Sequence, residues 1–335
     1  MTRWQEAAQK VRDGMSVRIV GMDDVIEKLL LCIFTGNHAL LVGVPGLAKT
    51  LVISSLAELM DLSFRRIQFT PDLMPSDITG TEVLGLNEGT RAFQFLPGPV
   101  FANVVLADEI NRTPPKTQAA LMEAMEERQV TSVGQRYLLP HPFFVLATQN
   151  PIDMEGTYPL PAAQLDRFMF RIRVEYPESD AEARVARRVS RGAAEPLNAV
   201  LSRDEILAFG DDLKNVEMPD ALQQTVVNMV RATRPDDEGA PDFVREWIAF
   251  GAGPRAAQAL SIGGRARALI YGRNKVTEND IAALAPDVIR HRLVLNYHAT
   301  AEGVRAVDVV RRLLRQHFRR EPTPQKQTIW QRLFS

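Results

Sequence analysis

The chain has 335 residues, of which 45% are hydrophobic and 24% are charged, a composition typical of a folded globular protein and not of a disordered one. Its 40 basic and 41 acidic side chains give a net charge of -1, so no overall charge favours binding to nucleic acid or to an anionic membrane. Because single hydrophobic cores stop growing beyond roughly 250 residues, we expect two domains.

The N-terminal third contains no segment that predicts membrane insertion or export. The longest apolar run, residues 29–34, is far shorter than the ~20 residues that a transmembrane helix needs. The first eleven residues mix Arg3, Glu6 and Lys10 with alanines and lack the apolar core of a signal peptide. We therefore expect a cytoplasmic protein without a transmembrane segment, in which the single cysteine, Cys32, is a core residue.

The first half of the chain alternates between helical and strand patterns. Residues 22–34 place apolar side chains on one helical face, and residues 38–44 form an apolar run that ends in glycine and proline. Similar runs, typical of buried strands, follow at residues 64–70, 104–108, 143–148 and 168–174. Helical patterns such as residues 115–128 mostly separate them, which predicts a parallel five-stranded sheet flanked by helices.

No comparable apolar run follows residue 177, and the pattern becomes helical. We expect helices at residues 220–231, 254–271 and 277–285, the last opened by Thr277 with Asp280 in a variant of the capping box. The predicted parts are an N-terminal helix (1–18), an α/β domain (19–178), a linker or helix (179–200), an all-helical domain (201–318) and a tail (319–335).

A candidate phosphate-binding loop joins the first predicted strand to a helix. Backbone N–H groups at a helix N-terminus can surround phosphates, so Lys49 would reach the terminal phosphates of ATP and the Thr50 hydroxyl would bind Mg²⁺. Glycine usually precedes the lysine, so the Cβ of Ala48 either fits a right-handed backbone or tightens the loop. The alternative is a Gly-Pro turn with a solvated lysine. The nucleotide-binding residues would be Gly43, Val44, Pro45, Gly46, Leu47, Ala48, Lys49, Thr50 and Leu51.

Two carboxylates end the strand at residues 104–108. Because side chains alternate along a strand, Asp108 and Glu109 should point in different directions. Asp108 would then organise Mg²⁺ through its waters, and Glu109 would polarise the attacking water. Alone, such a pair is more often a solvated strand end, and the upstream lysine loop is what favours the catalytic interpretation.

Asn150 ends the next apolar run and precedes Pro151. In a parallel sheet it should lie at the same edge as Asp108, where its amide could hold the attacking water or the γ-phosphate. A simple Asn-Pro turn is the alternative. The five histidines, at positions 38, 141, 291, 298 and 317, have no spacing typical of a zinc site, and we expect surface or capping roles for them.

The order of these motifs resembles that of AAA+ ATPases, and further strings are similar to the MoxR family. Those strings run from Asp108 to Arg112, through Pro114-Pro115-Lys116-Thr117-Gln118, Ala147 to Pro151, Leu165-Asp166-Arg167-Phe168 and Gly253-Pro254-Arg255-Ala256. The resemblance covers about residues 15–318 and includes the Ala-Lys-Thr ending of the phosphate loop. It implies a helical lid after the AAA+ core and a ring, usually a hexamer, with ATP at each subunit boundary.

The resemblance also implies roles for three arginines. Arg167 would be the arginine finger that a neighbouring subunit supplies to the γ-phosphate, and Arg255 would match sensor 2. Alternatively, Arg167 merely pairs with Asp166, and Arg255 is solvated at a helix N-terminus, an unfavourable place for a cation. Arg112 could be a second trans-acting arginine or an interface ion pair. Residues 77–98 resemble the helix-2 insert, and residues 129–142 resemble a pre-sensor 1 hairpin turning near Gly134.

The function that this resemblance implies is ATP-driven remodelling, assembly or metal insertion of a partner protein, often one with a von Willebrand factor A domain. Two other classes stay open: a DNA-acting motor, which the neutral total charge disfavours, and a nucleotide-regulated scaffold with little turnover. Glu109, Asn150 and Arg167, assigned here as catalytic, argue against the scaffold.

Overall fold

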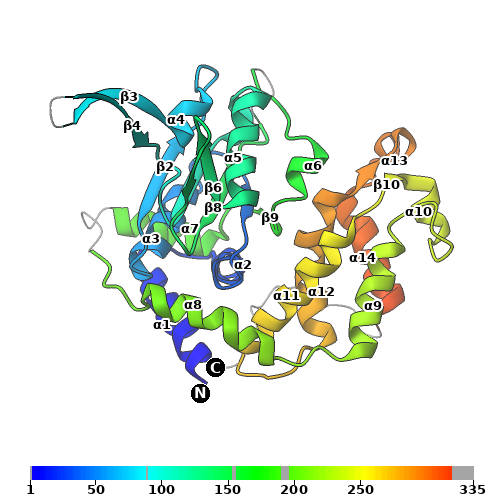
Figure 1. Cartoon of the computed structure of the whole chain (residues 1–335). Coiled ribbons are helices and arrows are strands. Elements are labelled where there is room, and N and C mark those ends of the chain that lie inside the picture. Colours follow the sequence, from blue (N-terminus) through cyan, green and yellow to red (C-terminus); the bar gives the residue numbers. More distant parts are fainter. Residues whose placement is uncertain (1, 88–89, 153–155, 190–195, 319–335) are drawn as a thin grey trace.

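A computed structural model describes residues 2–87, 90–152, 156–189 and 196–318 of the chain (Figure 1). An α/β layer structure and a helical region lie side by side. The expected tail, residues 319–335, and residues 190–195 of the expected linker lie outside the described residues. Within the described part, none of the helices combines the length and apolar character needed to cross a bilayer.

The predicted five-stranded parallel sheet is confirmed, with the strand order β2-β5-β8-β1-β9. Its strands are β1 (Ala39–Val42), β2 (Phe64–Gln68), β5 (Val104–Asp108), β8 (Phe144–Gln149) and β9 (Phe170–Arg173). β5 has the predicted bounds, and the other strands differ from the apolar runs by one to two residues at an end. Four of the strands are largely buried, whereas β2 is an exposed edge strand.

Helices cover both faces of the sheet because its side chains alternate between two cores. Val104 and Leu106 pack into the core beneath α1 (Arg3–Arg18), α2 (Asp23–Phe34) and α3 (Lys49–Leu59). Val105 and Ala107 face the opposite core, which α5 (Pro115–Glu127) closes. The remaining helices of this half are α4 (Pro75–Thr79), α6 (Ala162–Leu165), α7 (Ser179–Val189) and the 3-10 helix η1 (Ile110–Arg112).

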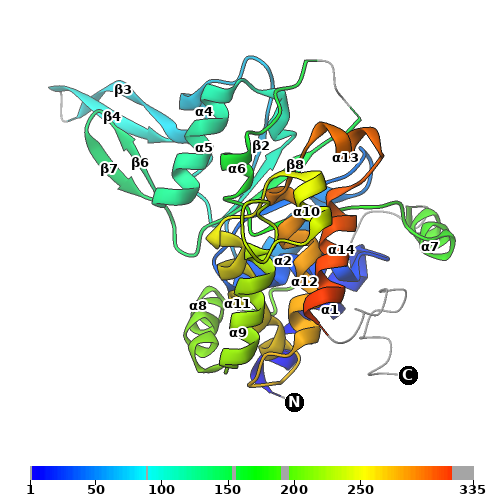
Figure 2. The ribbon, with the colours of Figure 1, turned by 90° about the vertical axis from the view of Figure 1, so that its right-hand side faces the viewer.

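Two antiparallel hairpins project from the sheet (Figure 2). One consists of β3 (Gly80–Asn87) and β4 (Thr90–Pro97), and the other of β6 (Gln129–Ser132) and β7 (Gln135–Leu138). The second turns at Val133 and Gly134, both with positive φ, as a two-residue turn requires. The rings of Phe95 and Tyr137 stack at 4.0 Å, so the two hairpins form one projecting unit.

The helical region contains seven α-helices within the described residues: α8 (Arg203–Asp212), α9 (Asp220–Arg231), α10 (Asp242–Trp247), α11 (Pro254–Ile270), α12 (Glu278–Ile289), α13 (Tyr297–Ala301) and α14 (Ala306–His317). The 3-10 helices η2 (Leu213–Asn215) and η3 (Arg290–Arg292) extend α8 and α12. The region is not purely helical, because β10 (Ile248–Phe250) and β11 (Val294–Leu295) pair antiparallel. These strands are too short to give an apolar run in the sequence.

Buried ion pairs attach the helical region to α2 of the α/β part. Arg267 of α11 contacts Glu27 at 2.9 Å and Asp280 at 2.8 Å, and Lys28 contacts Asp287 of α12 at 2.5 Å. Burial opposes the charge of Arg267, but the two carboxylates outweigh it and raise its pKa. Each charge is therefore compensated at the junction, which burial of ionic groups requires.

Candidate active site

Three strands bring the predicted motifs to the carboxyl edge of the sheet. β1 pairs with β8 so that Val42 lies opposite Gln149, and the N–H of Gly43 donates to the carbonyl of Gln149 at 3.2 Å. β5 lies on the other side of β8, and the Thr148 hydroxyl donates to Asp108 at 2.5 Å. The phosphate loop, the two carboxylates and Asn150 therefore meet at one edge, as predicted for parallel strands.

The candidate phosphate loop spans residues 43–50 and leads into α3, which begins at Lys49. Gly46 has a φ of +82°, a conformation that favours glycine. The Lys49 ammonium donates to the carbonyl oxygen of Val44 at 3.0 Å and to that of Gly43. Burial lowers the pKa of Lys49, and the charges of Asp108 and Glu109 oppose this shift, so the lysine faces both carboxylates.

Ala48 has a left-handed backbone, with a φ of +51° and a ψ of +21°. Of the two predicted interpretations, the right-handed fit is therefore wrong. The residue adopts a left-handed geometry that favours glycine, and its Cβ costs about 1–2 kcal/mol there. Thr50 follows in the first turn of α3, and Leu51 is 40% exposed beside it.

The predicted strand alternation does not extend from Asp108 to Glu109. β5 ends at Asp108, and Glu109 has a left-handed backbone with a φ of +58°. Asp108 accepts hydrogen bonds from Thr148 at 2.5 Å and from Arg66 at 2.6 Å. The N–H of Glu109 donates to Thr148 at 2.9 Å, so one hydroxyl fixes both acidic residues.

Two side chains hold the Glu109 carboxylate. Gln68 of β2 donates to its Oε2 at 3.1 Å, and Arg112 contacts the same oxygen at 3.2 Å. Arg112, for which the sequence left a trans-acting or interface role open, thus pairs within its own subunit here. Both contacts are to Oε2, so they fix the orientation of the carboxylate and leave acceptor positions on Oε1 for a water molecule.

Asn150 is buried immediately after β8. Its side-chain oxygen accepts from the N–H of Ile152 at 3.1 Å, which is the local turn that the Asn-Pro pair suggested. The residue also lies next to Gln149, the partner of the phosphate-loop strand. Its position is therefore compatible with both predicted roles.

Arg66, Gln68 and Thr148 belong to this site, although the sequence analysis did not identify them. Arg66 and Gln68 alternate along β2, where Gln68 lies opposite Asp108. The sequence signal was two polar residues, Arg66 and Gln68, at alternate positions of a short, mostly exposed strand. It becomes interpretable only when β2 is known to lie beside β5.

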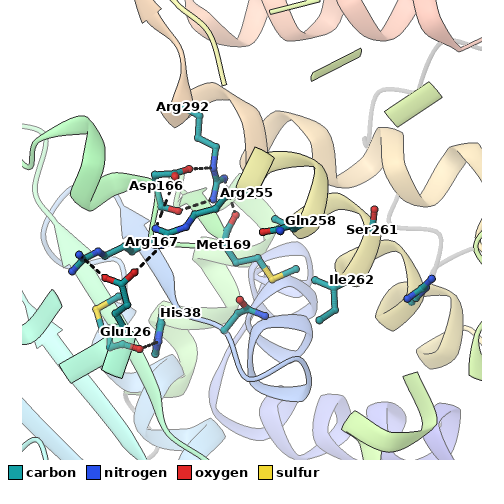
Figure 3. Close-up of a pocket in the computed structure, with 14 residues that line it drawn as sticks. His38, Glu126, Asp166, Arg167, Met169, Arg255, Gln258, Ser261, Ile262 and Arg292 are labelled. Atoms are coloured by element: carbon teal, nitrogen blue, oxygen red, sulfur yellow. Dashed lines mark hydrogen bonds and ion pairs between the residues drawn. The ribbon is translucent and has the colours of Figure 1, made fainter. Parts of the chain in front are cut away.

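Arg167 and Arg255 lie together at a second location, a cavity of about 500 Å³ between α5, the segment before β9, and α11 (Figure 3). Arg167 contacts Oε2 of Glu126 at 2.6 Å, and Arg255 contacts Oε1 of the same residue at 2.9 Å. Asp166, the alternative partner considered for Arg167, contacts Arg292 at 2.7 Å and Arg255 at 3.9 Å instead. Arg255, 46% exposed, is anchored by an anion at its helix N-terminus.

This cavity lies at the amino-terminal edge of the sheet. Its lining includes His38, which directly precedes β1, whereas the phosphate loop begins at Gly43, directly after β1. A four-residue strand spans about 13 Å. Arg167 and Arg255 therefore lie at the opposite edge of the sheet from Lys49 of the same subunit.

His38 links the cavity to the sheet. Its Nδ1 accepts from the N–H of Val145 at 2.9 Å, so Nε2 carries the proton and donates to the carbonyl of Met125 at 3.3 Å. Burial lowers the pKa of His38 to about 4, so the ring is neutral at pH 7. The capping role expected for the histidines fits His38, which holds the last turn of α5, where Glu126 lies.

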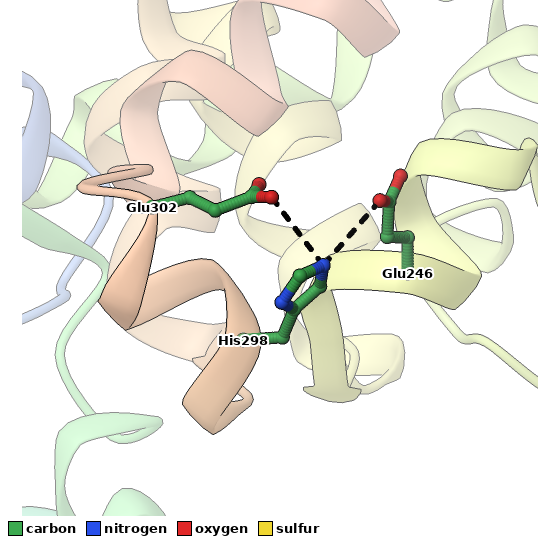
Figure 4. Close-up of side chains that lie close together, drawn as sticks. All are labelled: Glu246, His298 and Glu302. Atoms are coloured by element: carbon green, nitrogen blue, oxygen red, sulfur yellow. Dashed lines mark ion pairs between the residues drawn. The ribbon is translucent and has the colours of Figure 1, made fainter.

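One histidine has neighbours that its sequence spacing did not indicate. His298 lies between Glu246 of α10 and Glu302, with Nε2 at 3.6 Å and 3.4 Å from their carboxylates (Figure 4). All three side chains are exposed. The group joins α10 to α13 on the outer surface of the helical region and takes no part in the two locations above.

Comparison with known proteins gives consistent matches over both regions. The model of the ATPase family associated with various cellular activities matches residues 38–170, and that of the AAA lid domain matches residues 243–313. The chain is 44% identical over 297 residues to the chaperone MoxR1 of Mycobacterium tuberculosis, with 88% of this chain and 78% of the relative covered. It is 30% identical to the protein MoxR of Methylorubrum extorquens, with 97% of each covered. A crystal structure of a Cytophaga hutchinsonii protein assigned as an ATPase matches with a TM-score of 0.87 and 42% identity, covering 93% of this chain and 94% of that one.

Proposed function

This chain belongs to the MoxR family of AAA+ ATPases and hydrolyses ATP, and on that basis we propose that it acts as a ring whose nucleotide sites are each built by two neighbouring subunits. One subunit supplies the phosphate loop, Asp108, Glu109 and Asn150, and its neighbour supplies Arg167 and Arg255. ATP hydrolysis in a hexamer of this kind drives chaperone-like work on a partner protein. The cytoplasmic location expected from the sequence is part of the proposal.

The observation that carries this proposal is the separation of the two groups of residues. Arg167 and Arg255 share a cavity with His38 at one edge of the sheet, whereas Lys49 and the two acidic residues lie at the other. An arginine that acts on phosphate must donate hydrogen bonds directly to its oxygens. Since the arginines cannot reach their own phosphate loop across the sheet, their phosphate belongs to the next subunit.

Within one site, each side chain has a distinct task. The Lys49 ammonium leaves the carbonyls of Gly43 and Val44 to bind the β- and γ-phosphates, and Glu109 orients the attacking water. The hydroxyl of Thr50 and the carboxylate of Asp108 are the hard oxygen donors that Mg²⁺ prefers, and Asp108 would bind it through water. The bound Mg²⁺ would neutralise phosphate charge. Asn150 would hold the water or the γ-phosphate.

Ring formation is tested by measuring both the mass of the assembly and the ATPase rate per subunit. Sedimentation in the presence of ATP should give the mass of a hexamer, and the ATPase rate per subunit should rise with protein concentration as rings form, because each site needs two chains. A monomer that turns over ATP at the same specific rate at every concentration would contradict the proposal.

We propose the unit formed by the two hairpins as the contact surface for the client. It carries six exposed large apolar side chains: Val83, Leu84, Phe93, Leu96, Val133 and Leu138. The register of the first hairpin pairs Leu84 with Phe93, so these two exposed side chains lie together on one of its faces. Exposed apolar groups of this kind mark sites of protein interaction. β8 is the next element after β7, and Asn150 follows β8, so the second hairpin and part of the nucleotide site belong to one continuous segment of the chain. The family resemblance suggests a client with a von Willebrand factor A domain.

A purified von Willebrand factor A protein from the same genome should raise the ATPase rate of the parent protein. The double substitution Leu84→Ser and Phe93→Ser should remove this stimulation and leave the basal rate unchanged, because neither residue contacts the nucleotide site. Tyr297→Ser is the matched control, since Tyr297 is 89% exposed on the helical region. Stimulation that survives the double substitution would exclude the hairpins as the contact surface.

A further inference from the structure

We propose that Glu126 is the positioning residue for both arginines, holding Arg167 and Arg255 in the geometry in which they meet the terminal phosphate of the neighbour's ATP. This inference rests on the proposed trans-acting role of those arginines. It assigns a positioning task to the carboxylate of Glu126 in α5. We call the surface formed by Glu126, Arg167 and Arg255 the donor face, because it would supply hydrogen-bond donors to the neighbour's phosphate.

Glu126 divides its two oxygens between the arginines (Figure 3). Oε2 lies 2.6 Å from Nη2 of Arg167, and Oε1 lies 2.9 Å from Nη2 of Arg255. The arginines come from different parts of the chain, one before β9 and the other from the first turn of α11. Two guanidinium groups so close repel each other, and the carboxylate between them offsets this repulsion. Without its charge, the two cations would separate.

The backbone on both sides of this contact is already fixed, so the remaining freedom lies in the arginine side chains. Arg292 is buried and donates to the Asp166 carboxylate at 2.7 Å, to the Asp166 carbonyl at 3.0 Å and to the Phe168 carbonyl at 2.9 Å. These contacts hold the segment that carries Arg167. His38 holds the end of α5 through the carbonyl of Met125.

The contact with Glu126 is compatible with phosphate binding. A guanidinium group has five N–H donors, and each arginine contacts Glu126 through one terminal nitrogen. Arg255 and Arg167 keep further donors for an anion, and the Arg255 side chain is 46% exposed. Glu126 therefore orients both guanidinium groups while leaving N–H donors available to the phosphate.

Glu126→Gln tests the charge while keeping the size and the hydrogen-bonding oxygen of the side chain. We expect kcat to fall about tenfold, with unchanged ATP affinity and ring mass, because the substitution alters orientation at the neighbour's site. Glu126→Asp, which keeps the charge, should recover part of the loss. Glu127→Gln is the matched control, because Glu127 is the next residue of α5, is exposed, and forms no ion pair or side-chain hydrogen bond with the described residues.

Mixed rings distinguish positioning from a general structural defect. Adding inactive Glu109→Gln subunits should raise the rate of Glu126→Gln subunits, since the added subunits carry an intact donor face. Adding Arg167→Ala subunits should give no rise, because both variants are then defective on the donor face. Recovery with Arg167→Ala would place Glu126 in its own subunit's site and overturn the proposal, as would a parental rate for Glu126→Gln.

A variant without the two arginines separates this inference from the trans-acting role itself. When Arg167→Ala and Arg255→Ala are combined, Glu126→Gln should lower the residual rate far less than it does in the parent, because its effect passes through those two side chains. A full additional tenfold loss would overturn the positioning role. Failure of Arg167→Ala and Glu109→Gln subunits to complement each other, both in mixed rings and in a linked dimer with one intact boundary, would instead overturn the nucleotide site shared between two subunits.

Discussion

Arg167→Ala should lower the ATPase rate by about 10³- to 10⁵-fold, the contribution of an arginine supplied to the γ-phosphate in comparable enzymes. The side chain lies on the far edge of the sheet from its own phosphate loop, so the loss should appear at the neighbour's site. ATP binding, measured by calorimetry, should change little. The ATPase rate at saturating ATP is the measurement that tests this prediction.

The stronger form of this prediction uses two inactive proteins. Arg167→Ala subunits keep Glu109, and Glu109→Gln subunits keep the arginine, so a mixed ring regenerates complete boundaries and activity should partly return. A linked dimer with one intact boundary should be assayed beside the mixture, because hydrolysis could need several complete sites. If both variants fold, bind nucleotide and co-assemble, yet neither format restores turnover, Arg167 does not act in trans.

Glu109→Gln should lower turnover by about 10²- to 10⁴-fold while ATP stays bound, since the amide keeps the size of the side chain but cannot polarise water. Its partners Gln68 and Arg112 contact the carboxylate and not the phosphate loop, so nucleotide affinity should remain near that of the parent. Single-turnover hydrolysis and calorimetric ATP affinity measure the two effects separately.

Lys49→Ala provides the contrasting variant for the same assay. Removing a charged hydrogen-bond donor to phosphate should weaken ATP binding by about 10- to 100-fold. The two variants thus separate binding from hydrolysis. Unchanged affinity in Lys49→Ala would refute the phosphate loop, and a parental rate in Glu109→Gln would refute the role of the acid.

Sequence patterns predicted the sheet well because each buried strand carries its own signal. β5 has the predicted bounds, and its final aspartate lies at the expected edge. Backbone reversals carry a weaker signal. Ala48 and Glu109 both have positive φ, and neither residue type indicates a left-handed conformation.

Contacts between distant elements could not be predicted from one sequence. Glu126 is one of several acidic residues at the end of a helical pattern, and nothing local distinguishes it from Glu127. It becomes distinctive because the fold brings the segment before β9 and the first turn of α11 to the same carboxylate. Likewise, Arg66 and Thr148 meet at Asp108 only through the strand order.

The ion pairs that attach α11 and α12 to α2 oppose a hinge motion between the helical region and the α/β part. Swinging the helical region away would separate Arg267 from Glu27 and Lys28 from Asp287, so each of these buried cations would lose one carboxylate partner. These contacts therefore oppose bending within the subunit, at the junction between its α/β part and its helical region. In the proposed ring, we therefore expect ATP hydrolysis to move the two regions of a subunit together, as one body, relative to the neighbouring subunits.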